Sequence, residues 1–132
     1  MAMDGATAPV GLDAVRSLAA DYCHAIHEGD GPALERILHP LFQMHFPVGG
    51  EMQIMDKPHF VARLSGRGPL EGAPSFEILS VDGDANEIAR VALWVDLGPR
   101  RFTDFLGFQR VGGGWQLISK LTRVARGPAL DS

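Results

Sequence analysis

The amino-acid sequence predicts an α+β fold, in which three N-terminal-side helices and a cone-shaped, strongly curved antiparallel sheet enclose a pocket. Two observations favour this fold. Helical periodicity is confined to the part of the chain before residue 66, and four strand-like segments joined by short turns follow it. Consecutive strands joined by tight turns pair as antiparallel neighbours, so the second part forms a meander. Helices gathered on one face of a curved sheet enclose a cavity.

Length, charge and cysteine content restrict the class of protein. The 132 residues suffice for one domain, which we place at 13–126 between flexible tails at 1–12 and 127–132. The net charge of −4 and the lack of a Lys/Arg cluster argue against nucleic-acid binding. The sequence shows neither a secretory signal nor an apolar run long enough to span a bilayer. Together with the single cysteine, Cys23, this predicts a cytoplasmic protein without a membrane partner.

The first helix is predicted from the N-cap Asp13 to Glu28, with Gly29 as its stop. Its apolar residues fall on one face, which we expect to pack on the sheet: Val15, Leu18, Ala19, Tyr22 and Ile26. Tyr22 therefore points inward, and its hydroxyl requires a hydrogen-bond partner if it is buried.

Caps, glycines and prolines delimit the remaining elements before the last hairpin. Asp30 and Asp56 are each expected to cap a helix, and Pro40 prevents the second helix from continuing beyond His39. In order, we expect a helix at 31–38, strands at 41–46 and 51–55, a helix at 57–65, a loop at 66–75, and strands at 76–81 and 87–97 separated by a turn at 82–84.

The C-terminal hairpin carries the strongest indication of a site. Two apolar runs flank three glycines at 112–114, which supply the positive φ angles of a tight turn. If Val111 pairs with Trp115, then Asp104 and Lys120 lie diagonally across from each other on one face, among Phe and Ile side chains. A turn one residue longer or shorter would separate them. The opposite face is apolar and carries Phe105, Trp115, Leu117 and Leu121.

The order of these elements resembles the nuclear transport factor 2-like superfamily of cystatin-like α+β cones, which includes ketosteroid isomerases, scytalone dehydratases and polyketide-cyclase-like proteins. The similarity to its putative lumazine-binding branch rests on Tyr22 followed by Gly29-Asp30, Leu38-His39-Pro40, the run from Arg101 to Leu106, and Gly114-Trp115 followed by Ser119-Lys120. It covers roughly residues 13–124. Because members of the superfamily often pair through the convex sheet face, the resemblance implies a homodimer.

Asp104 has two interpretations. As a carboxylate desolvated by Phe102 and Phe108, it would act as a general base. As the partner of Lys120, it would stay ionised in a structural ion pair. We favour this second interpretation, because ion pairs of this kind are the more frequent arrangement. An ion-paired Asp104 could still orient a ligand. Tyr22 is open in the same way, as a hydrogen-bond donor to a ligand carbonyl or as a core tyrosine.

Other residues are weaker candidates. His39 fits a helix-end hydrogen bond better than a catalytic role, and Trp94 with Met44 or Met55 would supply an aromatic, soft lining. His24, His27 and Glu28 have helical spacing, but we interpret them as a solvated face rather than a metal site. No zinc or phosphate-loop motif occurs, so we expect neither a metal nor another cofactor.

We therefore expect a small-molecule binding protein with a largely apolar cone pocket. Its ligand, a small hydrophobic or aromatic molecule, would contact Tyr22, His39, Trp94, Asp104 and Lys120. One alternative is a cofactor-independent lyase or isomerase with Asp104 as base and Tyr22 as electrophile. The other is a homodimeric protein-interaction module that uses the apolar outer face of the hairpin.

Overall fold

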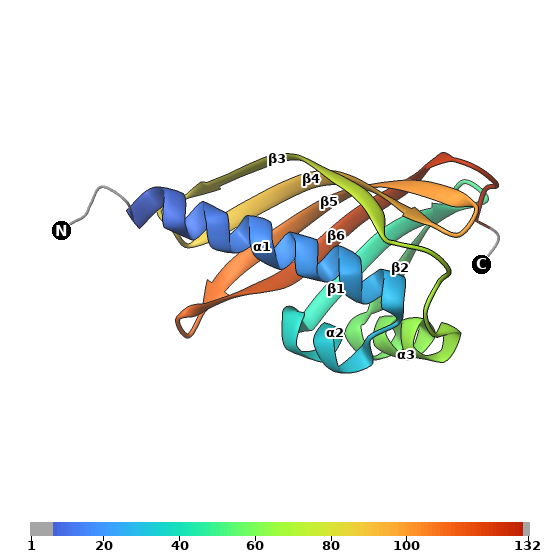
Figure 1. Cartoon of the computed structure of the whole chain (residues 1–132), viewed down its shortest axis with the longest axis horizontal. Helices are drawn as coiled ribbons and strands as arrows, with labels where there is room; N and C mark the ends of the chain where they lie inside the picture. The colour runs from blue at the N-terminus through green and yellow to red at the C-terminus, as the bar shows by residue number, and fades with distance from the viewer. Residues whose placement is uncertain (1–6, 131–132) are drawn as a thin grey trace.

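Three helices and six strands follow each other in the order that the sequence predicts. A computed structural model describes residues 7–130, and Figure 1 shows a long helix lying across a twisted sheet, with two shorter helices at one end. The elements are α1 (Thr7–Glu28), α2 (Gly31–Ile37), β1 (Leu38–Val48), β2 (Glu51–Asp56), α3 (Lys57–Arg67), β3 (Ser75–Asp84), β4 (Ile88–Leu97), β5 (Arg100–Val111) and β6 (Gly114–Arg126). No helix within the described range is long and apolar enough to cross a membrane.

The sheet is mixed rather than purely antiparallel. Its strand order is β2-β1-β6-β5-β4-β3. β3 to β6 form the predicted meander, and β1 and β2 form an antiparallel hairpin. The difference lies at the junction, where β1 pairs with β6 in parallel. Adjacent parallel strands require a long connection, and here α3 and the whole meander carry the chain from one strand to the other.

The helix ends largely follow the predicted caps. The carboxylate of Asp30 accepts a hydrogen bond from the Ala33 amide at 3.1 Å, and that of Asp56 accepts one from His59 at 3.2 Å. The exception is the start of α1, which lies at Thr7 rather than at Asp13. Part of the segment expected to be a tail is therefore helical, while residues 1–6 and 131–132 of the two expected tails lie outside the described range.

The turn between β3 and β4 lies three residues later than predicted, at 85–87 rather than 82–84. Strand β3 continues through 82–84, and Gly83 pairs with Ala89 inside the ladder. Ala85 and Asn86, at φ angles of 55° and 57°, make the reversal instead. Two successive left-handed residues are typical of the two-residue hairpin turns that match the twist of a sheet. The glycine in the sequence therefore marks a close approach of backbones rather than the turn itself.

The β5–β6 hairpin combines a shorter turn with a compensating bulge. Val111 pairs with Gly114 across Gly112 and Gly113, so the turn is one residue shorter than predicted. A register shift follows, because Phe108 pairs with Leu117 but the next pair along joins Gly107 to Ser119 and leaves one extra residue on β6.

Beyond this bulge the predicted pairing is confirmed. Asp104 lies opposite Thr122, and Leu106 lies opposite Lys120. Trp115 and Leu117 were placed on the wrong face: Trp115 pairs with Arg110, and Leu117 is fully buried opposite Phe108 on the inner side. The shorter turn shifts the alternation of residues 114–117, and the bulge restores it only at Ser119.

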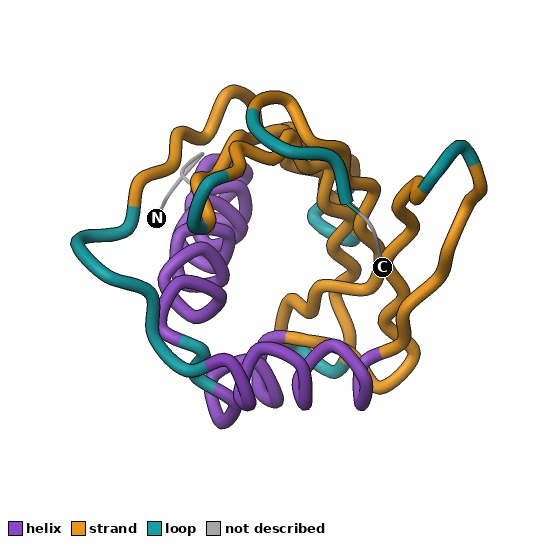
Figure 2. The backbone as a smooth tube through the Cα atoms, turned by 90° about the vertical axis from the view of Figure 1, so that its right-hand side faces the viewer, coloured by secondary structure: helices purple, strands orange, loops and turns teal. Residues whose placement is uncertain are grey.

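The helices and the curved sheet form the walls of one interior. Figure 2 shows the backbone from one end, with helices along two sides and strands completing the ring. The buried face of α1 carries Val15, Ala19, Tyr22 and Ile26, as the helical periodicity predicts. α1 packs on β3 and β4, whereas α3 packs on β1 and β2. The hydrophobic core takes buried side chains from all three helices and from the inner face of the sheet.

Gly29 provides a test of how α1 and α3 are joined. Its φ is 66°, and a Cβ atom there would lie 2.7 Å from the Leu64 carbonyl oxygen. Gly49 has a similar φ of 59° but nothing within 4 Å, so it serves as a matched control. We expect Gly49→Ala to lower the free energy of unfolding by about 1 kcal/mol through backbone strain, and Gly29→Ala to lower it by roughly 2 kcal/mol more through the clash. Urea denaturation measures both, and equal losses would contradict the close approach.

Candidate functional site

A cavity of about 350 Å³ lies between α3, the β1–β2 hairpin and the strands β5 and β6. It is at the end of the molecule where Figure 1 shows α3 and the C-terminus. Its apolar lining comes from Met44, Phe46, Met55, Phe60, Leu64, Leu70, Leu97, Phe102 and Leu130. The charged and hydroxyl-bearing side chains are Arg63, Arg67, Arg100, Asp104, Lys120 and Thr122. The volume is at the small end of the range for ligand pockets, about 300–1,000 Å³.

Asp104 lies on the inner face of β5 and is fully buried. Its Oδ1 accepts a hydrogen bond of 2.6 Å from the Thr122 hydroxyl, directly across the strand pair. Its Oδ2 lies 3.6 Å from Lys120 Nζ, and no hydrogen-bond donor of the described residues satisfies it. One carboxylate oxygen is therefore fixed by the fold, and the other has only the charge of Lys120 to offset its burial.

Lys120 connects the sheet to α1. Its side chain is almost completely buried, and Nζ donates a 2.6 Å hydrogen bond to the hydroxyl oxygen of Tyr22. The same ammonium lies 4.9 Å from the ring centroid of Phe60 and 5.3 Å from that of Tyr22. A cation over an aromatic face gains electrostatic stabilisation, and this contribution grows in a desolvated site. Asp104, Lys120 and Tyr22 thus form one network that links β5, β6 and α1.

Burial near this network keeps Tyr22 and Cys23 of α1 protonated. Burial, and secondarily the negative charge of Asp104, raises the pKa of the Tyr22 phenol well above its ordinary value. Burial and Asp104 likewise raise the pKa of the Cys23 thiol to about 12, although the charge of Lys120 opposes the shift. Because both charged forms are disfavoured in the folded state, Tyr22 acts here as a neutral hydrogen-bond partner and Cys23 as an unreactive thiol.

The structure brings some of the predicted site residues together and not others. Asp104 and Lys120 line the cavity, with Tyr22 behind Lys120 and outside the lining. His39 is on β1, where its Nδ1 accepts a hydrogen bond from the Leu41 amide at 3.0 Å, and it does not line this cavity. Trp94 also lies away from the cavity.

The position of Trp94 follows from strand alternation, since its neighbours in β4 are buried on the inner side. Its Nε1 donates to Glu77 at 3.2 Å, and the Arg101 guanidinium lies 3.5 Å from the ring centroid. Met44, Met55 and Phe102 do supply the soft, aromatic lining that the sequence indicated, whereas Phe108 does not reach it.

One of the two α1 histidines that the sequence placed on a solvated face is buried. His24 is exposed and contacts the Phe76 ring edge-on. His27 is buried, because the loop at 68–74 folds against the end of α1 and the Gly72 carbonyl lies 2.9 Å from His27 Nε2. The part of the chain that the structure describes contains no group of three His, Cys, Asp or Glu residues arranged to hold a metal ion.

Sequence reasoning missed four polar residues of the site. The predicted pairing of Val111 with Trp115 already places Thr122 directly opposite Asp104, so its role as the hydrogen-bond donor to Asp104 could have been inferred. The three arginines come from α3 and from the start of β5. No local pattern marks them, because they converge only when these elements pack around one cavity.

The family follows from comparison of the sequence with known families. The profile of the family described as "Putative lumazine-binding" matches residues 11–122. The chain belongs to this family. The match includes the elements that carry Tyr22, Asp104 and Lys120, and it confirms the branch that the sequence resembles.

Solved structures connect this lumazine-binding family member to the nuclear transport factor 2-like superfamily. An NTF2-like protein of unknown function from Silicibacter pomeroyi is 30% identical, with a TM-score of 0.83 over 89% of this chain and 98% of that one. A second one, from Shewanella baltica, is 15% identical, with a TM-score of 0.78 over 87% and 94%. A ketosteroid isomerase-like protein from Erwinia carotovora atroseptica is 16% identical, with a TM-score of 0.69 over 87% and 96%. The last two show the shared fold alone. Among curated proteins, the chain finds no match.

A double-mutant cycle tests the energetic coupling of the buried pair. Asp104→Leu and Lys120→Met each leave one buried charge without its partner, so each should lower the free energy of unfolding by roughly 3–5 kcal/mol. The double variant removes both charges, and it should be more stable than the summed single effects predict by about 2 kcal/mol. Urea unfolding of the four proteins gives the coupling energy. Strictly additive losses would show that the two charges do not stabilise each other.

Proposed function

We propose that the protein binds a small, largely apolar or aromatic molecule in the cavity, with Asp104 and Lys120 as its innermost polar contacts. The observation that carries this proposal is the unsatisfied Oδ2 of Asp104, a buried carboxylate oxygen on a residue that lines an otherwise mostly apolar space. Leaving such an acceptor without a donor costs free energy, so a ligand N–H or O–H placed there gains a charge-assisted hydrogen bond.

The positions of the two charged groups determine which hydrogen-bonding groups a ligand must offer. Asp104 Oδ2 accepts hydrogen bonds, and Lys120 Nζ, 3.6 Å away, donates them. A hydroxyl group, or a ring N–H beside a carbonyl, offers a donor and an acceptor at such neighbouring positions. The family description supports a ligand of this kind, because the dione ring of lumazine carries N–H groups next to carbonyl groups.

Binding fits the geometry better than catalysis by a lyase or isomerase. Asp104 accepts a hydrogen bond from Thr122 through Oδ1, and its Oδ2 lies 3.6 Å from Lys120 Nζ, an ion-pair arrangement that suits holding a ligand better than general-base catalysis. The Tyr22 hydroxyl already receives a hydrogen bond from Lys120 and lies outside the cavity lining, so it is not placed to polarise a ligand carbonyl.

Titration with lumazine tests the proposal. Isothermal titration calorimetry should show saturable binding to the wild type and an affinity at least about tenfold lower for Asp104→Asn, since the substitution removes the charged acceptor. Asp82→Asn is the matched control: it makes the same change at an exposed residue that does not line the cavity, and it should bind like the wild type.

Because Asp104→Asn leaves Lys120 without its counter-charge, its fold must be checked by circular dichroism. Leu70→Trp gives an independent test, since it narrows the cavity from a half-buried loop position without touching the ion pair. It should also weaken lumazine binding. Equal affinities for the wild type, Asp104→Asn and Leu70→Trp would place the ligand elsewhere.

A second observation favours self-association. Ile54, His45, Leu121 and Phe105 occupy consecutive cross-strand positions on β2, β1, β6 and β5. Ile54, Leu121 and Phe105 are each more than half exposed. We propose that this outer row contacts the same row of a second copy of the chain. A two-fold symmetric dimer brings the same surface of both copies together, so the apolar side chains of the row would be removed from water.

Replacing Phe105 by glutamate tests the homodimer. Size-exclusion chromatography with light scattering should give about twice the chain mass of 14.2 kDa for the wild type and the single chain mass for Phe105→Glu, because a buried unpaired carboxylate opposes association. Leu41→Glu, at an exposed position outside the row, should remain dimeric. A monomeric wild type would exclude a second copy of the chain as the partner of the outer row.

A further inference from the structure

Three arginines line the same cavity. Arg63 and Arg67 are one turn apart on α3, and Arg100 begins β5. Together with Lys120 they give the lining four basic side chains against the single carboxylate of Asp104. This concentration is opposite in sign to the whole chain, whose net charge is −4.

None of the three arginines has an acidic partner in the part of the chain that the structure describes. The ion pairs found there within 4.0 Å join other residues, and the only pair at the cavity is that of Lys120 with Asp104. The charge of Lys120 is therefore already balanced at the inner end of the cavity, whereas the positive charge of the arginines is not.

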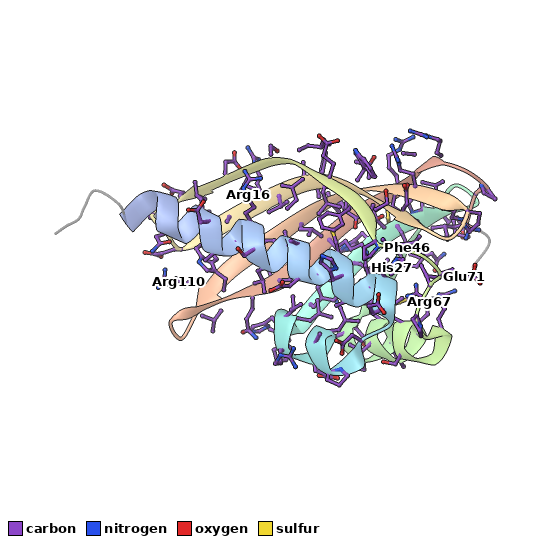
Figure 3. The ribbon with its side chains drawn as sticks, viewed as in Figure 1. Arg16, His27, Phe46, Arg67, Glu71 and Arg110 are labelled. Carbon is purple, nitrogen blue, oxygen red and sulfur yellow. The ribbon has the colours of Figure 1, made fainter. Side chains whose placement is uncertain are left out.

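Backbone carbonyls hold two of the guanidinium groups in place. Arg67 donates to the carbonyl oxygens of Gly68 at 3.0 Å, His27 at 3.2 Å and Ile26. Figure 3 shows Arg67 near His27, at the junction of α1 and α3. Arg100 donates through Nε and Nη2 to the Pro128 and Ala129 carbonyl oxygens, at 2.8 and 3.1 Å.

These contacts leave the Nη1 group of both arginines without a partner among the described residues. Arg63 makes no side-chain hydrogen bond there at all. Guanidinium groups already held in position lose less conformational entropy when an anion binds. Partial burial also lowers the pKa of Arg67 from its ordinary value, and a neighbouring anion would offset that loss of hydration.

We infer that the ligand is an organic acid: an apolar or aromatic body carrying one carboxylate, sulfonate or phosphate group, which Arg63, Arg67 and Arg100 bind while the body packs against Phe46, Phe60 and Phe102. This inference rests on the proposed function, because it requires a ligand in the cavity. Arginine is suited to the role, since its planar donor group matches the geometry of carboxylate and phosphate oxygens.

An isosteric pair of probes separates the charge from the apolar body. Naphthalene-2-acetate and naphthalene-2-acetamide have nearly the same shape, and only the first is an anion. Isothermal titration calorimetry should show about tenfold tighter binding of the acetate to the wild type, as expected for one charge-assisted contact set. Added salt should lower the affinity for the acetate and leave the affinity for the acetamide unchanged, because screening acts only on the charged probe.

Arg63→Gln should remove most of the preference for the acetate without changing the affinity for the acetamide. Arg36→Gln is the matched control, because Arg36 is an exposed arginine of α2 that does not line this cavity. If both variants lost the preference for the acetate equally, the preference would come from the net charge of the protein, and the inference would be overturned. Equal affinities of the wild type for the two probes would also overturn it but leave the proposed function in place. No binding of either probe or of lumazine would overturn both.

Discussion

The buried ion pair between Asp104 and Lys120 is the interaction on which the site depends. Each group alone would be costly in an apolar interior, and the cost is offset because Thr122 satisfies one carboxylate oxygen, Tyr22 accepts from the ammonium and the two groups lie 3.6 Å apart. The same contacts join α1 to the two central strands of the sheet. Two residues of this structural network also line the cavity, so under the proposed function stability and ligand binding would rest on the same residues.

The cavity lining carries two sets of charged side chains. Its inner end is neutral overall, with the charge of Lys120 matched by that of Asp104. Its lining also contains the arginines of α3 and β5, which no carboxylate of the described residues neutralises. The rest of the lining is mostly apolar. This lining suits a molecule that combines hydrogen-bonding groups, an apolar body and a negative charge.

The hairpin shows how a correct contact can follow from an incomplete prediction. The turn is one residue shorter than the sequence suggested, which alone would have moved Asp104 and Lys120 to opposite faces. The extra residue in β6 restores the pairing before Lys120 is reached. The two differences do not cancel between the turn and the bulge, so Trp115 and Leu117 were assigned to the wrong face.

Local sequence patterns were enough to predict the order of elements, the caps at Asp30 and Asp56, the inward face of α1 and the shared face of Asp104 and Lys120. Periodicity, capping and turn chemistry are local, so they can be inferred from neighbouring residues. Only the tertiary structure decided that β1 lies parallel to β6 and that arginines from α3 and β5 meet at one cavity. Those relations join segments far apart in the chain, and they arise from how the packed layers bury apolar surface rather than from a local pattern.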